Sequence, residues 1–171
     1  ALWLSLGEAD QRRFLRHVVR HWDVHRHRIA ESVHAQVSEL ERSGQLQRHR
    51  ARLDTLLVQE GGLQLHGHGP AGGLPPLTVS AVINATGVET RALCMRNPLI
   101  QQLLADGHAR PGPHGLGLDT SVENGELLGA DGQCQTRVLV VGSLRIGTLW
   151  ESLAIPELRM QAQQAALRAV G

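Results

Sequence analysis

The sequence predicts an α/β protein, with an α+β arrangement for this stretch of chain by itself, and three observations point to it. Apolar residues recur at helical spacing over residues 1–44. Short apolar runs broken by Gly and Pro follow, and the chain closes with a strand, a turn and a helix. We therefore expect a helical segment over 1–44, and a β-meander with a C-terminal strand–turn–helix over 45–171.

The N-terminal segment is expected to hold two helices. Ser5 and Glu8 have the spacing of a capping box, and apolar residues then recur at helical intervals, which predicts a helix from about Gly7 to His21. A second apolar stripe ends at Ser43-Gly44, where glycine suits a left-handed C-terminal cap. The residues of this stripe are Ile29, Val33, Val37 and Leu40.

The middle of the chain is expected to form the meander. Predicted strands cover 52–58, 63–66 and 77–85, and Glu60-Gly61-Gly62 has the composition of a hairpin turn. The glycine-rich stretch 66–73, followed by Pro75-Pro76, indicates an exposed loop.

The C-terminal part begins with a helix signal. Asn97-Pro98 is a cap followed by proline at the first helical position, and the helix should run to Asp106 with Gly107 as its stop. Short strands are expected at 116–119 and 126–128, with a core strand at 137–141. The last helix is expected from about Pro156 to Ala169.

Two of these apolar runs stop at a glycine, one at Val82–Gly87 and the other at Val138–Gly142. In α/β proteins a buried strand that ends at glycine lets the backbone approach a ligand closely. The pair suggests a nucleotide or flavin cleft, yet neither run adjoins a Gly-rich phosphate loop, so the chain resembles part of a site. The closely spaced Gly112, Gly115 and Gly117 follow prolines and precede no helix, which indicates a surface loop.

Composition excludes several classes of function. The sequence contains no lysine, which rules out a Schiff-base or Walker lysine within it, and the net charge of +1 gives no field toward nucleic acid or membrane. No window approaches the roughly 20 apolar residues of a membrane helix. Cys94 and Cys134 lack CxxC spacing and are expected to be reduced, buried or inert thiols. A cytoplasmic protein without nucleic-acid or membrane partners is expected.

Several stretches are more specific than these patterns. In the C-terminal part they are Asn97-Pro98-Leu99 to Asp106-Gly107, Ala109-Arg110-Pro111, Leu116-Gly117-Leu118-Asp119, and the run from Gly142 to Ala162; earlier in the chain they are residues 12–17, 21–28 and 82–87. Together they resemble the C-terminal portion of the largely uncharacterised FAD/NAD(P)-binding protein family, which is related to flavin monooxygenases and other two-dinucleotide flavoproteins. The run 142–162 is the most specific part.

The resemblance implies a partial Rossmann-like fold and an oxidoreductase-like parent that binds FAD, and possibly NAD(P). The FAD pyrophosphate would be held by an N-terminal half with G-x-G-x-x-G on a strand–turn–helix; that element is absent here, and the missing half is therefore the expected partner. By itself the chain is expected to bind no cofactor and to be inactive. Redox chemistry would belong to the cofactor, so no catalytic acid or base is assigned.

The resemblance also implies which residues flank the flavin. The turn 146–150 would direct backbone amides at the pyrimidine edge of the isoalloxazine, with Thr148 and Glu151 in capping-box spacing at the start of a helix. Related flavoproteins often have Asp after the last strand's glycine, where this chain has Ser143, and proline where it has Val88. The candidate cofactor-binding residues are Thr86, Gly87, Gly142, Ser143, Gly147, Thr148, Leu149 and Trp150.

Two alternatives stay open. The chain could be a non-catalytic binding module or a homo-oligomerisation module, because a portion without its partner half exposes apolar surface. His17, His21 and His25 lie four residues apart with His27 close by, so a helix could turn imidazoles to one face and bind a metal. The arginine-rich stretch 12–28 is compatible with a solvated helix face as well as with phosphate.

Overall fold

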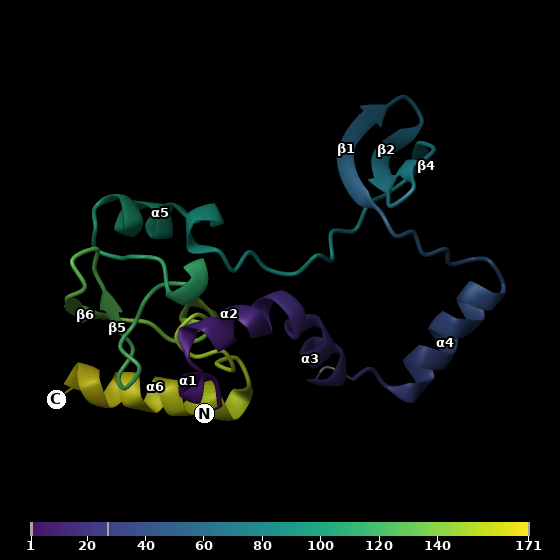
Figure 1. Ribbon diagram of the computed structural model, residues 1–171. Helices are drawn as coiled ribbons and strands as arrows, with labels where there is room; N and C mark the ends of the chain where they lie inside the picture. The colour runs from purple at the N-terminus through teal and green to yellow at the C-terminus, as the bar shows by residue number, and fades with distance from the viewer. Residues whose placement is uncertain (1, 27, 171) are drawn as a thin grey trace. The chain divides into compact units, whose positions relative to one another are not determined.

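The computed structural model describes residues 2–26 and 28–170 and shows an α+β chain with antiparallel sheets (Figure 1). The chain forms two compact units. Unit 1 combines residues 1–20 with 88–171, and unit 2 comprises residues 21–87. The boundary suggested by the sequence, near residue 45, falls inside unit 2.

The N-terminal segment is helical, as predicted, but its first helix is divided. Short helix α1 covers Leu2–Ser5, α2 covers Glu8–His17 and α3 covers Val19–Arg26. The capping box is wrong, because Ser5 lies in α1 and the N-cap of α2 is Gly7, which has no side-chain cap. The second predicted helix is confirmed as α4, Glu31–Arg42. Gly44 follows it with φ of +78°, in the left-handed conformation that terminates helices.

The predicted meander is a four-stranded sheet in unit 2 (Figure 1). Its strands are β1 (Arg52–Gln59), β2 (Gly62–Gly69), β3 (Gly72–Gly73) and β4 (Leu77–Val79). β1 and β2 form the predicted antiparallel hairpin, with Gln59 paired to Gly62. The other side of β2 pairs with both β3 and β4. The expected loop 66–73 is therefore mostly strand, because β2 continues to Gly69 and β3 covers Gly72–Gly73.

The predicted buried strand that ends at Gly87 is wrong. β4 stops at Val79, and residues 82–87 form no strand and are exposed. Ile83, the centre of the apolar run, is 90% exposed. Asn84 instead organises a local turn, since its Oδ1 accepts hydrogen bonds from the N–H and the hydroxyl of Thr86 at 3.1 and 2.8 Å.

Unit 1 contains the predicted helix α5, Pro98–Ala105, between the 3-10 turns η1 (Ala92–Cys94) and η2 (Pro113–Gly115). The Asn97 cap is confirmed: its Oδ1 accepts from the N–H groups of Leu99 and Ile100. The glycine loop after α5 is more buried than a surface loop. Gly117 has φ of +59°, and a Cβ there would lie 2.1 Å from the Leu144 carbonyl oxygen.

The β-structure of unit 1 is an antiparallel ribbon of β5 (Glu126–Leu128) and β6 (Cys134–Leu139). The predicted core strand 137–141 is thus displaced toward the N-terminus and is mostly exposed. No parallel sheet occurs among the described residues, so a Rossmann arrangement is not seen here. The 3-10 turn η3 (Ser143–Arg145) follows β6, and the predicted last helix is confirmed as α6, Ile155–Val170.

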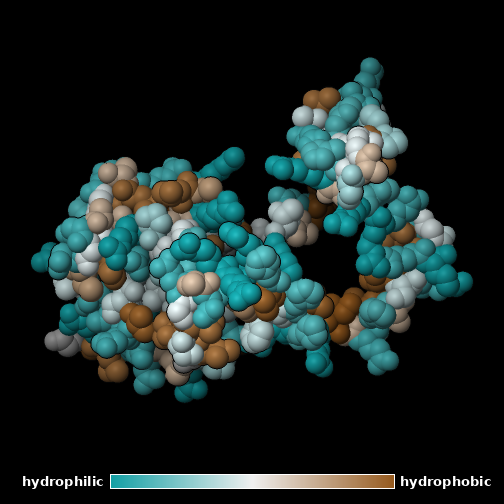
Figure 2. Space-filling model, in the orientation of Figure 1, coloured by the Kyte–Doolittle hydropathy of each residue, from teal (hydrophilic) through white to brown (hydrophobic). Residues whose placement is uncertain are grey.

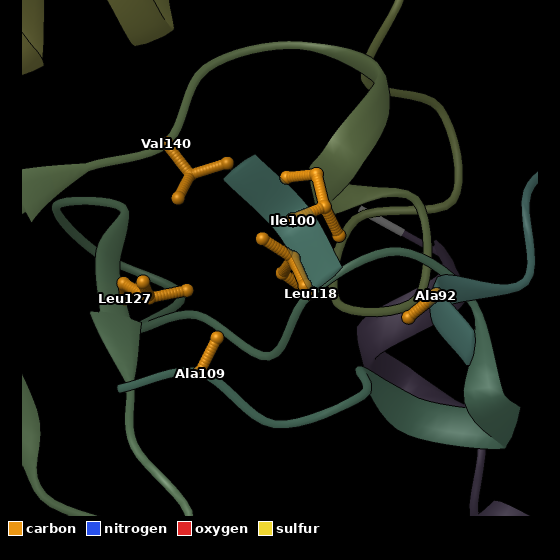
Figure 3. Close-up of a cluster of buried hydrophobic side chains, with 6 residues drawn as sticks. All are labelled: Ala92, Ile100, Ala109, Leu118, Leu127 and Val140. Carbon is orange, nitrogen blue, oxygen red and sulfur yellow. The ribbon is translucent and has the colours of Figure 1, made fainter. Parts of the chain in front are cut away.

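The hydrophobic core of unit 1 is small. Figure 3 shows side chains from η1, α5, the following loops and the β5–β6 ribbon directed toward one another. Met95, Leu103, Leu104 and Leu144 pack against it. The core residues are Ala92, Ile100, Ala109, Leu118, Leu127 and Val140.

Candidate functional site

The candidate residues of unit 1 lie on one turn between β6 and α6. Gly142 begins it with φ of +86°, a conformation that favours glycine. The Gly142 N–H donates to Gln161 Oε1 at 2.9 Å, and its carbonyl accepts from the Ser152 hydroxyl at 3.3 Å. Gln161 Nε2 in turn donates to the Ser152 carbonyl at 3.0 Å. Gly142, Ser152 and Gln161 therefore form a closed, buried network that joins the turn to α6.

The Arg145 side chain is almost fully buried and joins the turn to residues 120–122 by hydrogen bonds. Nη2 donates to the carbonyls of Ser121 and Val122 at 2.8 and 3.0 Å, and Nε donates to Thr120 Oγ1 at 3.3 Å. Burial lowers the pKa of Arg145. Two carbonyl dipoles, rather than a carboxylate, therefore compensate this buried charge.

Gly147 is required by contacts within the chain. A Cβ at this position would lie 2.3 Å from the Leu116 carbonyl oxygen and 2.8 Å from that of Pro113. The Gly147 carbonyl accepts a buried 3.1 Å hydrogen bond from Trp3 Nε1. The glycine thus lets the loop around η2 and the N-terminal segment meet on the turn.

An aromatic cluster covers the same turn. Trp3 packs against Trp150 at a ring separation of 5.3 Å and meets the edges of Phe14 and His114 at 6.0 Å each. Phe14 also contacts Trp150 at 5.5 Å. We call Trp3, Phe14, His114 and Trp150 the aromatic clasp. It anchors α1 and α2 over the turn.

Gln11 reinforces the clasp by hydrogen bonding. Its Nε2 donates to the Trp3 carbonyl at 3.0 Å, and its Oε1 lies 2.9 Å from His114 Nε2. His114 has φ of +59°, an uncommon conformation for a residue other than glycine. The α2 helix therefore holds both an N-terminal tryptophan and a strained loop histidine.

No helix begins at Thr148, so the capping box predicted with Glu151 is wrong. Thr148 is buried, and its Oγ1 accepts from the Thr120 hydroxyl at 3.4 Å. Leu149 N–H bonds back to the Arg145 carbonyl at 2.7 Å, which closes one helical turn, and α6 begins only at Ile155.

Thr86 and Gly87 belong to unit 2, whereas the other candidates lie in unit 1. The structure thus brings together Gly142, Ser143, Gly147, Thr148, Leu149 and Trp150 on one turn and leaves Thr86 and Gly87 in an exposed segment of the other unit. Within the turn, Ser143 is exposed, while Leu149 and Trp150 are half-buried.

The structure supports no chemical role for the histidine cluster or for the two cysteines. Among the described residues, no three His, Cys, Asp or Glu side chains could hold a metal ion, and His27 lies outside those residues. Cys94 and Cys134 are free and exposed, so the expectation that they are buried is wrong. Desolvation, together with the neighbouring carboxylate of Glu126, raises the pKa of Cys134 and favours its unreactive thiol form.

Sequence reasoning missed the residues that shape the turn, namely Trp3, Gln11, His114 and Arg145. Arg145 carried a usable signal, because it is a lone charge between Leu144 and Ile146 in a Gly-flanked run. Trp3 and Gln11 carried none, since their partners are distant in the sequence.

Compared with known protein families, with curated proteins and with solved structures, the chain matches none of them. Within the part of the chain that the structure describes, no helix is both long and apolar enough to cross a membrane.

Proposed function

We propose that this chain is the cofactor-flanking portion of an FAD/NAD(P)-binding, oxidoreductase-like protein. The turn 142–150 would supply one wall of the flavin site, and a separate G-x-G-x-x-G half would hold the pyrophosphate. The proposal rests on the resemblance of the run 142–162. It gains support because Gly142, Ser152 and Gln161, all within this run, interlock by hydrogen bonds.

One observation carries the cofactor part of the proposal. The N–H groups of Gly147 and Thr148, both buried residues, form no hydrogen bond within the described residues. Buried backbone donors are nearly always paired in native proteins. A flavin whose pyrimidine edge carries negative charge on reduction is the kind of acceptor that would satisfy them.

The aromatic clasp covers the turn on which the flavin would bind. Trp3 donates to the Gly147 carbonyl and packs on Trp150, so the N-terminal segment covers the turn. In the proposed parent protein, a flavin ring would replace part of the contact that Trp3 makes. The chain by itself would then prefer its covered form and bind FAD weakly.

The chain supplies neither a phosphate-binding loop nor a parallel sheet in its described part. In the proposed arrangement both would come from the separate G-x-G-x-x-G half, and hydride chemistry would be the cofactor's own. The roles proposed for this chain's residues are to orient the flavin and to exclude water. Candidate donors are the N–H groups of Gly147 and Thr148, and Ser143 lies exposed at the edge of the turn.

A titration with FAD, followed by visible absorbance, tests the proposal. The intact chain should show no bound flavin, whereas a longer polypeptide that carries the upstream dinucleotide-binding half should show a protein-bound flavin spectrum. Absence of flavin binding in both would overturn the proposal.

A variant pair sharpens this experiment. Ser143→Asp places a carboxylate at the position where related flavoproteins often have one, and it should tighten FAD binding in the longer polypeptide. Ser38→Asp, on the exposed surface of α4, makes the same chemical change elsewhere and should leave FAD affinity unaltered. Equal effects of the two variants would contradict the assigned position of the flavin.

A further inference from the structure

One face of the unit 2 sheet is apolar over the paired part of β1, β2 and β4. Residues paired across antiparallel strands share a face, and successive residues of a strand alternate between faces. The strand registers therefore place two apolar rows on the same face. These rows are Leu56, Leu65 and Leu77, and Val58, Leu63 and Val79. The opposite face is mainly polar, and there Gln64 Oε1 accepts from Gln59 Nε2 at 3.0 Å and lies 2.9 Å from His66 Nε2.

Nothing buries this apolar face within the described residues of unit 2. Leu56 is 45% exposed, Leu77 is 49% exposed and Val58 is 83% exposed, and the other three residues of the two rows are half-buried. Among the described residues of unit 2, none is buried. A small sheet gains its stability by packing an apolar face against a second layer. The sheet of unit 2 therefore lacks a second layer.

The α4 helix carries a surface of the matching kind. Val33, Val37 and Leu40 follow one another at i, i+4 and i+7, so they form a stripe on one face of the helix. They are 45%, 36% and 41% exposed. Figure 2 shows apolar side chains, in brown, at the surface of both α4 and the sheet. A helix of 12 residues is only marginally stable in water, so α4 also depends on a surface that its stripe can pack against.

We propose that α4 packs this stripe on the apolar face of the sheet in the same chain and so completes unit 2 as a helix layer on a sheet layer. Residues 43–51 connect α4 to β1 and can span up to about 30 Å, which is ample for the chain to turn back over the sheet. A tether of this kind holds two surfaces at an effective concentration of about 1 mM. Tethering therefore favours α4 of the same chain over α4 of a second copy, and over a helix of another protein. The proposal is independent of the cofactor role, because it concerns unit 2 alone.

Two pairs of neighbouring residues test this packing. Val37→Asp places a charge within the stripe, and Ser38→Asp places the same charge outside it on α4. Leu77→Asp and Thr78→Asp form the corresponding pair on the two faces of β4. Hydrogen exchange of the α4 amides in the intact chain should become about tenfold faster or more in Val37→Asp and Leu77→Asp, and should stay close to wild type in the two controls. Leu77 lies outside α4, so a local effect on the helix cannot produce its result.

A cross-link distinguishes the same chain from a second copy. The free cysteines are first replaced, as Cys94→Ser and Cys134→Ser. Val37→Cys together with Leu65→Cys should then form a disulfide within one chain on mild oxidation, in a protein that stays monomeric in sedimentation velocity. Ser38→Cys together with Leu65→Cys is the control and should cross-link far more slowly.

Three results would overturn the proposal. One is exchange of the α4 amides at the same rate in wild type, stripe variants and controls. Another is a disulfide that forms only between chains, which would assign the apolar face to a second copy. The third is a disulfide that forms as readily from position 38 as from position 37.

Discussion

The hydrogen bond from Trp3 to Gly147 offers a sharp test of how unit 1 is held together. Trp3→Phe keeps an aromatic ring against Phe14 and Trp150 but removes the Nε1–H donor. Trp3→Ala removes the ring as well. Trp22→Phe is a matched control, because Trp22 lies in unit 2 and is 37% exposed.

The structure sets the expected magnitudes. Loss of the Trp3 donor leaves the buried Gly147 carbonyl without this partner, which costs about 1–3 kcal/mol in free energy of unfolding. Truncation to alanine adds the loss of a buried ring and should cost about 3–5 kcal/mol. The Trp22→Phe control changes a more exposed ring in the other unit and should cost less than Trp3→Phe.

Urea unfolding measures these differences. Fluorescence, to which Trp150 contributes, reports on the clasp, and far-UV circular dichroism reports on all helices. If the N-terminal helices detach before the rest of unit 1 unfolds, the two signals will not coincide, and the Trp3 variants will shift the fluorescence transition first. A Trp3→Phe protein as stable as the Trp22→Phe control would refute the assigned role of the clasp.

Three further predictions concern other contacts of unit 1. The hydrogen bond and charge of Arg168 lower the pKa of Glu126 below 4.5. The stability that this carboxylate contributes is therefore complete above pH 4.5 and is lost as the pH falls through the lowered pKa. Arg168→Gln should flatten this part of the pH profile of the urea midpoint. Arg145→Lys should cost roughly 2–4 kcal/mol in free energy of urea unfolding, because an ammonium cannot span the groups that the guanidinium reaches. A stability within about 0.5 kcal/mol of wild type would contradict this. Asn97→Ala should cost about 1 kcal/mol through loss of the α5 cap, as measured by thermal unfolding.

Local signals in the sequence predicted local structure well. Gly44 marked the end of α4, Glu60-Gly61 marked the β1–β2 turn, and Asn97-Pro98 marked the start of α5. Each signal works because a single backbone conformation or one short-range hydrogen bond decides the outcome. These features need no information about distant parts of the chain.

Predictions that depended on distant partners were less successful. The apolar run 82–87 was expected to be a buried strand, but an apolar run does not say which strand will pair with it, and none does in the described chain. Thr148 was expected to begin a helix because of its spacing to Glu151, yet its hydroxyl lies beside Thr120. On the candidate site, the positions of Gly142 and Gly147 in a tight turn were foreseen, and the clasp over them was not.

The Trp3–Gly147 contact has a consequence for the order in which the protein forms. Its two residues lie 144 positions apart, so the bond closes a loop that includes most of the chain. Long-range closure is entropically costly and slow. During synthesis α1 and α2 leave the ribosome before the turn 142–150, so their apolar side chains lack these partners until the turn has been made. The β1–β2 hairpin, which pairs neighbours in sequence, can form long before that moment. The hairpin can therefore fold before α1 and α2 reach their final contacts with the turn 142–150.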